Sequence, residues 1–262
     1  MTIIALASLA ACAAPKAIVP SRPIVLFGEV HDNAAQHALR LASFESMLRA
    51  GARPALLLEQ FDRERQGEID RVRAGNPAPD ADTIILAGSG APATATASWN
   101  WPFYRPLIAL ALANDLPIVA ANVSRDDTRR IVGEGLQARG FDPVVASDIT
   151  DGQSAAIEAS HCGMLDAATA RRMSSAQVAR DQFMARMVEA NAARGVVLLA
   201  GNGHVRTDIG VPRWLSPATR ERTESIGMLE SDDGQRPDDA AAFDRVIVTQ
   251  PQPRADPCAA MR

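Results

Sequence analysis

One segment near the start of the chain constrains the fold more than any other. Ile24–Phe27 is an apolar run of largely strand-favouring residues, and it leads directly into Gly28, Glu29 and His31. An amphipathic helical pattern then begins at about Asn33. This order predicts a buried strand, a sharp turn at the glycine and a helix. Open α/β folds bind ligands beyond the carboxyl ends of their strands, so Glu29 and His31 are expected at such an edge.

A second copy of the same pattern occurs far downstream. The apolar run Val196–Ala200 leads into Gly201 and His204, so Gly-x-x-His follows a predicted strand twice. One copy alone is more often a turn with a surface or core histidine. Two copies at matching strand ends favour a common site.

The intervening chain alternates between strand and helix patterns, which predicts an α/β fold with a mainly parallel sheet and helices on both faces. Further strands are expected at 54–60, 116–122, 225–230 and 243–250, and helices at about 33–50, 61–74, 106–114, 127–139 and 173–193. The last two strands are separated by the polar turn 231–240, and an antiparallel edge is one arrangement open to them. Segment 75–98 is rich in Gly, Pro, Ala, Ser and Thr, so it is expected to be a lid, a binding loop or a disordered excursion.

The predicted strand ends collect polar side chains with useful chemistry: Glu29, His31, Glu59, Asn122, Arg125, Asn202 and His204, with His37 a short way beyond. Carboxylates and imidazoles bind Zn²⁺, Mn²⁺ or Fe, and a carboxylate beside a histidine also suits a general base. The spacing of His31 and His37 does not match the His-Glu-x-x-His face of a zincin. Arg180 and Asp181 are either an ion pair that braces the cleft or a helix-surface pair.

Aromatic residues are concentrated in Trp99–Tyr104, which holds two of the three tryptophans and the only tyrosine. This segment is either a core anchor under a loop or an apolar wall for a flat ligand.

Composition excludes several functions. The net charge of −4 and the pI near 5.6 give no basic field for nucleic acid. The chain has no Gly-x-Gly-x-x-Gly, P-loop or Gly-x-Ser-x-Gly pattern, so dinucleotide binding, P-loop chemistry and the usual serine hydrolases are not supported.

The N-terminus suggests export. A short apolar run ends in Leu9-Ala10-Ala11-Cys12, which looks like a bacterial lipobox with lipid on Cys12. The expected organisation is a signal segment at 1–12, a tether at 13–23 and a single α/β domain at 24–262. Cys162 and Cys258 would then form a disulfide in an oxidising compartment, with two free thiols as the alternative.

Taken in order, several motifs resemble the ChaN-type haem-binding lipoproteins. They are Gly28–Asn33 through His37, Leu58-Glu59-Gln60, Ala121-Asn122, His161–Met164, Gln177-x-x-Arg180-Asp181 and Gly201–Arg206, spread over about 24–214. The resemblance implies an α/β protein of bacterial haem or iron uptake, held on a membrane by its lipid. More distantly, the two Gly-x-x-His motifs are similar to the Tiki, TraB and erythromycin-esterase-like group, which includes metal-dependent proteases and hydrolases.

Two functions therefore follow as hypotheses. In the first, haem is bound by one chain or between two copies of it, with Tyr104, His31 or His204 on the iron and Trp101 and Arg105 beside the porphyrin. In the second, Glu29, His31, Glu59 and His204 are catalytic, or bind a divalent metal together with His37. The expected location is the periplasmic side of a bacterial membrane, most simply the outer membrane.

Overall fold

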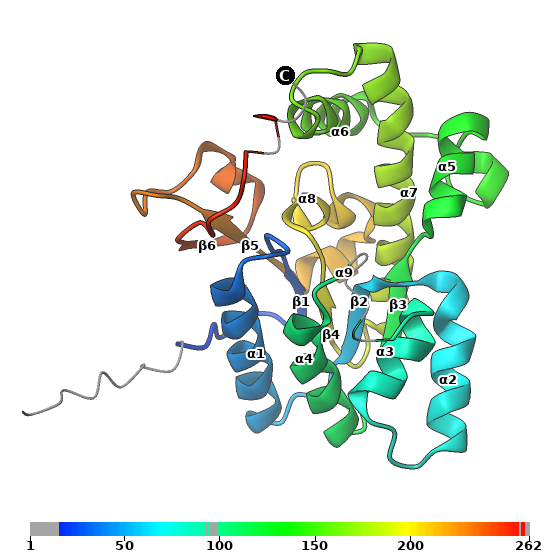
Figure 1. Ribbon diagram of the computed structural model, residues 1–262, viewed down its shortest axis with the longest axis vertical. Helices are drawn as coiled ribbons and strands as arrows, with labels where there is room; N and C mark the ends of the chain where they lie inside the picture. Colours follow the sequence, from blue (N-terminus) through cyan, green and yellow to red (C-terminus); the bar gives the residue numbers. More distant parts are fainter. Residues whose placement is uncertain (1–15, 93, 95–98, 257, 260–262) are drawn as a thin grey trace, which may run out of the picture.

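The computed structural model describes residues 16–92, 94, 99–256, 258 and 259. The expected signal segment and Cys12 lie outside these residues. The core is a six-stranded sheet in the order β3-β2-β4-β1-β5-β6, and every neighbouring pair is parallel (Figure 1). The strands are β1 (Ile24–Phe27), β2 (Ala55–Asp62), β3 (Ile118–Asn122), β4 (Val196–Leu199), β5 (Thr223–Glu230) and β6 (Arg245–Thr249).

The expectation of an antiparallel edge is wrong. β6 runs parallel to β5, with Ile226 opposite Arg245 and Glu230 opposite Thr249. Segment 231–244 is not a tight turn but a crossover that contains the 3₁₀ helix η4 (Asp238–Ala242). A connection of that length returns the chain to the start of the next strand, which a hairpin turn does not.

Helices cover both faces of the sheet, as the alternating pattern predicted. They are α1 (Ala34–Arg49), α2 (Gln66–Gly75), α3 (Ala81–Ser89), α4 (Trp101–Ala113), α5 (Arg125–Glu134), α6 (Ser147–Ser160), α7 (Ala167–Asn191), α8 (Asn202–Val205) and α9 (Pro217–Glu221), with the shorter 3₁₀ turns η1 (Arg63–Arg65), η2 (Leu136–Arg139) and η3 (Val211–Trp214). Successive strand side chains point to opposite faces. Val25 and Phe27 therefore pack with α1, α3 and α4, while Ile24 and Leu26 pack with α7. No helix among the described residues is long and apolar enough to cross a membrane.

Within segment 75–98, residues 81–89 form the helix α3, which the sequence did not predict. The Asp80 side chain accepts a hydrogen bond from the Thr83 amide at the start of α3, and Gly90 ends the helix with φ +74°. Ile84 and Ile85 are fully buried in the core. The N-cap and C-cap residues were visible in the sequence, but the surrounding Gly, Pro and Ala obscured them.

A smaller cluster of helices lies beyond the carboxyl ends of the strands. α5, α6 and α7 pack together around Val123, Ile131, Phe141, Ile149 and Val178. In Figure 1, α6 stands above the sheet on the far side of α8. These helices therefore face the strand ends that the sequence marked as a site.

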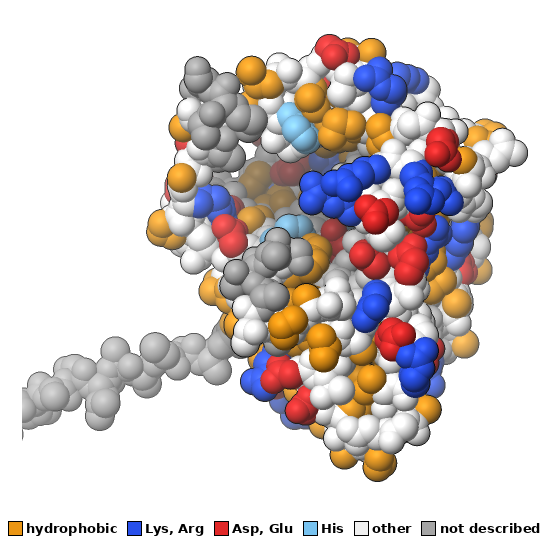
Figure 2. All heavy atoms as spheres, turned by 45° about the vertical axis from the view of Figure 1, so that its right-hand side comes forward, with side chains coloured by type: hydrophobic (Ala, Val, Ile, Leu, Met, Phe, Trp, Pro, Cys, Tyr) orange, Lys and Arg blue, Asp and Glu red, His pale blue; other side chains and the backbone are white. Residues whose placement is uncertain are grey.

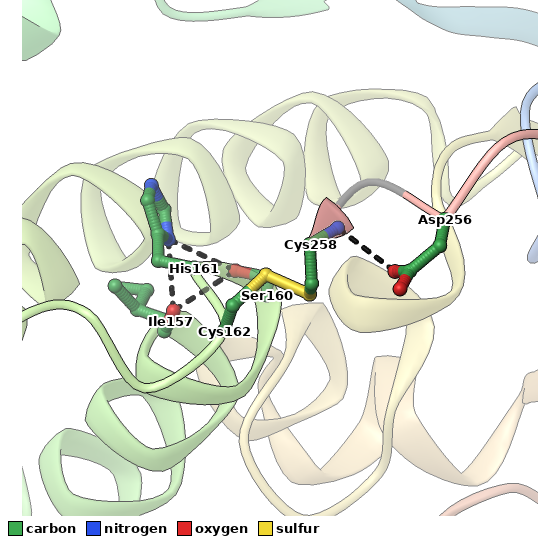
Figure 3. Close-up of a disulfide and its surroundings, with 6 residues drawn as sticks. All are labelled: Ile157, Ser160, His161, Cys162, Asp256 and Cys258. Carbon is green, nitrogen blue, oxygen red and sulfur yellow. Dashed lines mark hydrogen bonds between the residues drawn. A yellow bond between two sulfur atoms is a disulfide. The ribbon is translucent and has the colours of Figure 1, made fainter. Parts of the chain in front are cut away.

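The C-terminal tail is fastened at two points. The Arg254 guanidinium pairs with Asp32 at 2.5 Å and with Glu230 at 2.6 Å. Beyond it, Cys258 forms a disulfide with Cys162 in the turn after α6 (Figure 3). The predicted disulfide is thus confirmed, and the alternative of two free thiols is not.

Cys258→Ser is expected to lower the free energy of unfolding by about 2–4 kcal/mol, because the disulfide spans 96 positions and restricts the unfolded chain. Urea titrations of the variant and of the parent, each with and without reductant, measure the change. Reductant should destabilise only the parent, and a variant as stable as the parent would contradict the expectation.

Candidate functional site

The site is a cleft of about 650 Å³ where the carboxyl ends of β1, β2 and β4 meet α6 and α7. The order in which strands are added to the sheet reverses here. The chain places β2 and β3 on one side of β1 and then returns to insert β4 between β1 and β2. Such switch points form crevices at the carboxyl ends of the strands. Glu29, His31, Glu59 and His204 all line the cleft. Figure 2 shows the hollow, with histidine side chains at its rim and basic side chains beside it. The strand-end residues therefore converge as predicted.

The two Gly-x-x-His motifs interlock. A Cβ on Gly28 would clash with Oδ1 of Asn202. The Asn202 side chain is fixed there, because it donates to the Met228 carbonyl and accepts from the Met228 amide. A Cβ on Gly201 would lie 3.2 Å from the His31 ring. The sequence assigned Gly28 to a sharp turn, but its φ is not positive, and the glycine is required by close approach instead.

Glu29 is buried and holds three neighbours. Its Oε1 accepts a hydrogen bond from the Tyr104 hydroxyl and contacts Nδ1 of His31 at 2.5 Å, while its Oε2 pairs with the fully buried Arg40. Burial acts to raise the pKa of Glu29, but the Arg40 charge and the His31 hydrogen bond outweigh it and lower the pKa. Glu29 is therefore ionised, and both of its carboxylate oxygens already contact protein groups.

His31 is the accessible member of this group. Its Nδ1 is held by Glu29, and its side chain is 48% exposed. Within the described residues, no hydrogen bond reaches its Nε2. Although burial acts to lower the pKa of His31, the hydrogen bond with Glu29 and the charge of Glu59 raise it. A carboxylate that fixes one ring nitrogen orients the other as a ligand or a base.

His37 does not offer a nitrogen to the cleft. Its Nε2 donates to the His31 carbonyl at 2.9 Å, its Nδ1 accepts from Arg40 at 2.5 Å, and its ring stacks on Phe103. Burial and the charge of Arg40 lower the pKa of His37 to about 4, so the ring is neutral. It is a structural support for the turn that carries His31.

His204 lies between two carboxylates. Its Nδ1 contacts Asp181 at 2.6 Å and its Nε2 lies 3.5 Å from Glu59, whose other oxygen accepts the Gly201 amide at 2.7 Å. The expected pair of Arg180 and Asp181 is wrong, because Asp181 turns inward to His204 while Arg180 lines the cleft. The sequence did not show that this histidine would be an imidazolium bridge.

The electrostatics of this bridge follow from its burial and charges. Burial alone would lower the pKa of His204, but Asp181 and Glu59 raise it to about 10. Burial raises the pKa of Asp181 to about 6. Burial acts to raise the pKa of Glu59 as well, but the charge of His204 outweighs it and lowers the pKa to about 2. At neutral pH the bridge is an imidazolium with two carboxylates.

This bridge predicts a pH-dependent stability. Because the folded pKa of His204 exceeds its unfolded value of 6.5, its contribution is complete below pH 6.5 and is lost as pH rises through about 10. The stability difference between the parent and His204→Gln should therefore shrink from pH 6.5 to 10, by at most about 1.4 kcal/mol per pH unit. Urea titrations across this range measure it, with His161→Gln as the control. A constant difference would contradict the imidazolium bridge.

The aromatic segment divides between the cleft and the core. Trp99 lines the cleft, edge-on to His31 with ring centroids 4.8 Å apart. Trp101 and Tyr104 are buried behind it, and Trp101 stacks on Phe61. Arg105 pairs with Asp82 and lines a different cavity. Of the predicted haem contacts, the structure places His31 and His204 in the cleft, but not Tyr104, Trp101 or Arg105.

The same partners limit metal binding. Among the described residues, no group of three or more His, Cys, Asp or Glu side chains is arranged to hold a metal ion. Glu29 and His37 are committed to Arg40, and His204 to two carboxylates. The set predicted from sequence, Glu29, His31, His37, Glu59 and His204, is therefore brought together without forming a ready metal centre.

The fold and the cleft define a class: a parallel α/β protein with two histidine–carboxylate pairs at one sheet edge. A family model described as "Haem-binding uptake, Tiki superfamily, ChaN" matches residues 18–215, and the chain belongs to this family. No functionally curated protein matches the chain.

Several solved structures are similar to the chain, and the first of them supports the fold. ChaN of Campylobacter jejuni, described with cofacial haem binding, is 18% identical with a TM-score of 0.62, over 79% of this chain and 81% of that one. The type III effector HopBA1 is 11% identical with a TM-score of 0.49, over 88% of both chains. The H289N mutant of the erythromycin esterase EreC is 13% identical with a TM-score of 0.42, over 80% of this chain and 70% of that one.

Proposed function

We propose that this protein binds haem in the cleft for bacterial haem or iron uptake, with His31 as the axial ligand. The observation that carries the proposal is the His31 imidazole, held at Nδ1 by Glu29 and exposed at Nε2. Haem iron takes such a nitrogen as a ligand. Tyr104, the alternative ligand from sequence, is buried with its hydroxyl bonded to Glu29, so it does not reach a cleft ligand.

The cleft suits a flat, partly apolar ligand. Its volume of about 650 Å³ lies within the usual range for small-molecule sites. Trp99 supplies an aromatic edge beside His31, and Ala156 and Ile157 of α6 supply apolar surface opposite the strand ends. The arrangement therefore combines one exposed nitrogen donor with apolar walls.

The proposal extends to location and assembly. We infer export and lipid attachment at Cys12, which the Cys162–Cys258 disulfide supports because such bonds persist in oxidising compartments. A periplasmic position on the outer membrane follows from this inference. The ChaN relative is described as binding haem cofacially, and a homodimer of this chain with facing clefts is the corresponding arrangement here.

A hemin titration tests the proposal. Protein without the first 12 residues is titrated with hemin, and the Soret band and bound iron are measured after gel filtration. We expect a saturable Soret shift, with one haem per chain. If the Soret band stays that of free hemin at protein in excess, the chain does not bind haem and the proposal fails.

A hydrolase is the second candidate, favoured by the two imidazoles whose Nδ1 atoms contact carboxylates. In His31 this contact leaves Nε2 without a hydrogen bond among the described residues, as in a general base, whereas His204 is held as a cation between Asp181 and Glu59 and would orient the substrate. This candidate predicts turnover of an ester or a peptide that is lost in both His31→Ala and Glu59→Gln. Full haem binding without any turnover by the parent would exclude it.

A further inference from the structure

Arg180 of α7 is a cation without a carboxylate partner in the part of the chain that the structure describes. Its Nη1 donates to Gln177 Oε1 at 3.3 Å, and no carboxylate oxygen of the described residues lies within 4.0 Å of its guanidinium. The side chain is half-buried. Two other arginines near the site are paired: Arg63 with Asp127, and Arg40 with Glu29.

Arg180 also lies where three cavities meet. It lines the cleft of about 650 Å³, a second cavity of about 430 Å³ between α5, α6 and α7, and a third of about 280 Å³ beside β2. Arg125, the first residue of α5, lines the second and third cavities. In Figure 2 basic side chains gather at this side of the hollow. A ligand that fills the cleft therefore meets positive charge at the α7 side.

The nearby acidic groups of the described residues form no ion pair with Arg180, although its charge acts to lower the pKa of Asp62 and of Asp181. Asp62 lines the third cavity, but it accepts a hydrogen bond from Asn122 and forms no ion pair with either arginine. Asp126 pairs with Arg129 at 3.4 Å on the outer side of α5. Asp181 does not pair with Arg180, because its side chain contacts His204 instead. An anion from a ligand is the chemically matched partner for Arg180.

We propose that Arg180, assisted by Arg125, is the anion subsite of the cleft and binds a carboxylate of the ligand. This inference rests on the proposed function: when the ligand is haem, the carboxylate is a propionate, while His31 holds the iron. The sequence had placed Arg105 beside the porphyrin. In the structure Arg105 lies on another surface, where its guanidinium is paired with Asp82. An arginine binds a carboxylate through paired, charge-assisted hydrogen bonds, which water replaces poorly.

Three porphyrins distinguish the contact of the iron with His31 from the contact of a propionate with Arg180. Hemin offers iron and propionates, hemin dimethyl ester offers iron without carboxylate charge, and protoporphyrin IX offers propionates without iron. Each is titrated into the parent and Arg180→Gln by absorbance or tryptophan quenching. The control is Arg172→Gln, because Arg172 is an exposed arginine of the same helix that bonds Thr169.

We expect the parent to bind hemin about ten to a hundred times more tightly than the dimethyl ester, as loss of a charged hydrogen bond implies. Arg180→Gln should lose that preference, keep the Soret position of the hemin complex and bind protoporphyrin IX more weakly by the same factor. Arg172→Gln should behave as the parent.

The outcomes distinguish the two claims. Equal affinity of the parent for hemin and its ester, or an undiminished preference in Arg180→Gln, would overturn the anion subsite while leaving haem binding intact. Binding of protoporphyrin IX that depends on Arg180, without a Soret shift on hemin titration, would sustain the subsite and remove iron ligation by His31. No binding of any of the three by the parent would overturn both.

Discussion

Arg40→Met is expected to lower the free energy of unfolding by about 3–5 kcal/mol. The Arg40 side chain is fully buried in α1 and pairs with the buried carboxylate of Glu29, so the variant leaves that charge without its main partner. It also removes the donor to His37 and the cation over the Tyr104 ring. Urea denaturation at neutral pH measures the loss.

Two further variants show whether the buried charge is the cause. Adding Glu29→Gln to Arg40→Met removes the carboxylate that has lost its partner. The double variant should therefore be more stable than Arg40→Met alone, although Glu29→Gln by itself destabilises the parent. Arg49→Met changes an exposed arginine of the same helix that pairs with Glu45, and it should lower the free energy of unfolding by less than about 1 kcal/mol. Equal losses in Arg40→Met and Arg49→Met would contradict the buried ion pair.

His31→Ala is expected to weaken hemin binding at least about a hundredfold. Loss of an outer hydrogen-bond partner of a metal ligand already costs about 10–100-fold, and this change removes the ligand itself. Binding to the parent should also tighten as pH rises above 6.5, because the raised pKa of His31 keeps a proton on the ring at lower pH. Soret titrations from pH 6 to 9 measure both effects.

His161→Ala is the matched control, since His161 lies at the end of α6 with its Nδ1 against the Ile157 carbonyl and does not line the cleft. It should bind hemin as the parent does. An unchanged Soret spectrum and affinity in His31→Ala would contradict iron ligation by His31.

The sheet was predictable because its strands carry their own signals. Buried parallel strands are continuous apolar runs, and polar residues follow each run abruptly, so β1, β2, β3 and β4 and their meeting edge could be located. The direction of β6 could not, because a crossover of irregular backbone and a long hairpin loop look alike in sequence.

The support of the site was less predictable. In α1 the apolar residues Phe44 and Leu48 are buried, as the helical pattern predicts, but the polar residues Gln36, His37 and Arg40 are buried as well. A buried arginine is not detectable from periodicity, because its partner Glu29 lies on another element. Asp181 was found as a motif, but its pairing with His204 depends on how α7 crosses β4.

We propose that the Nε2 atom of His31 binds haem iron in the cleft. The most direct measurement is a crystal structure of the hemin complex, with an anomalous difference map recorded at the iron absorption edge. We expect one iron peak per chain, bonded to Nε2 of His31, with a propionate against Arg180. An iron peak bonded to another residue, or located outside the cleft, would contradict it.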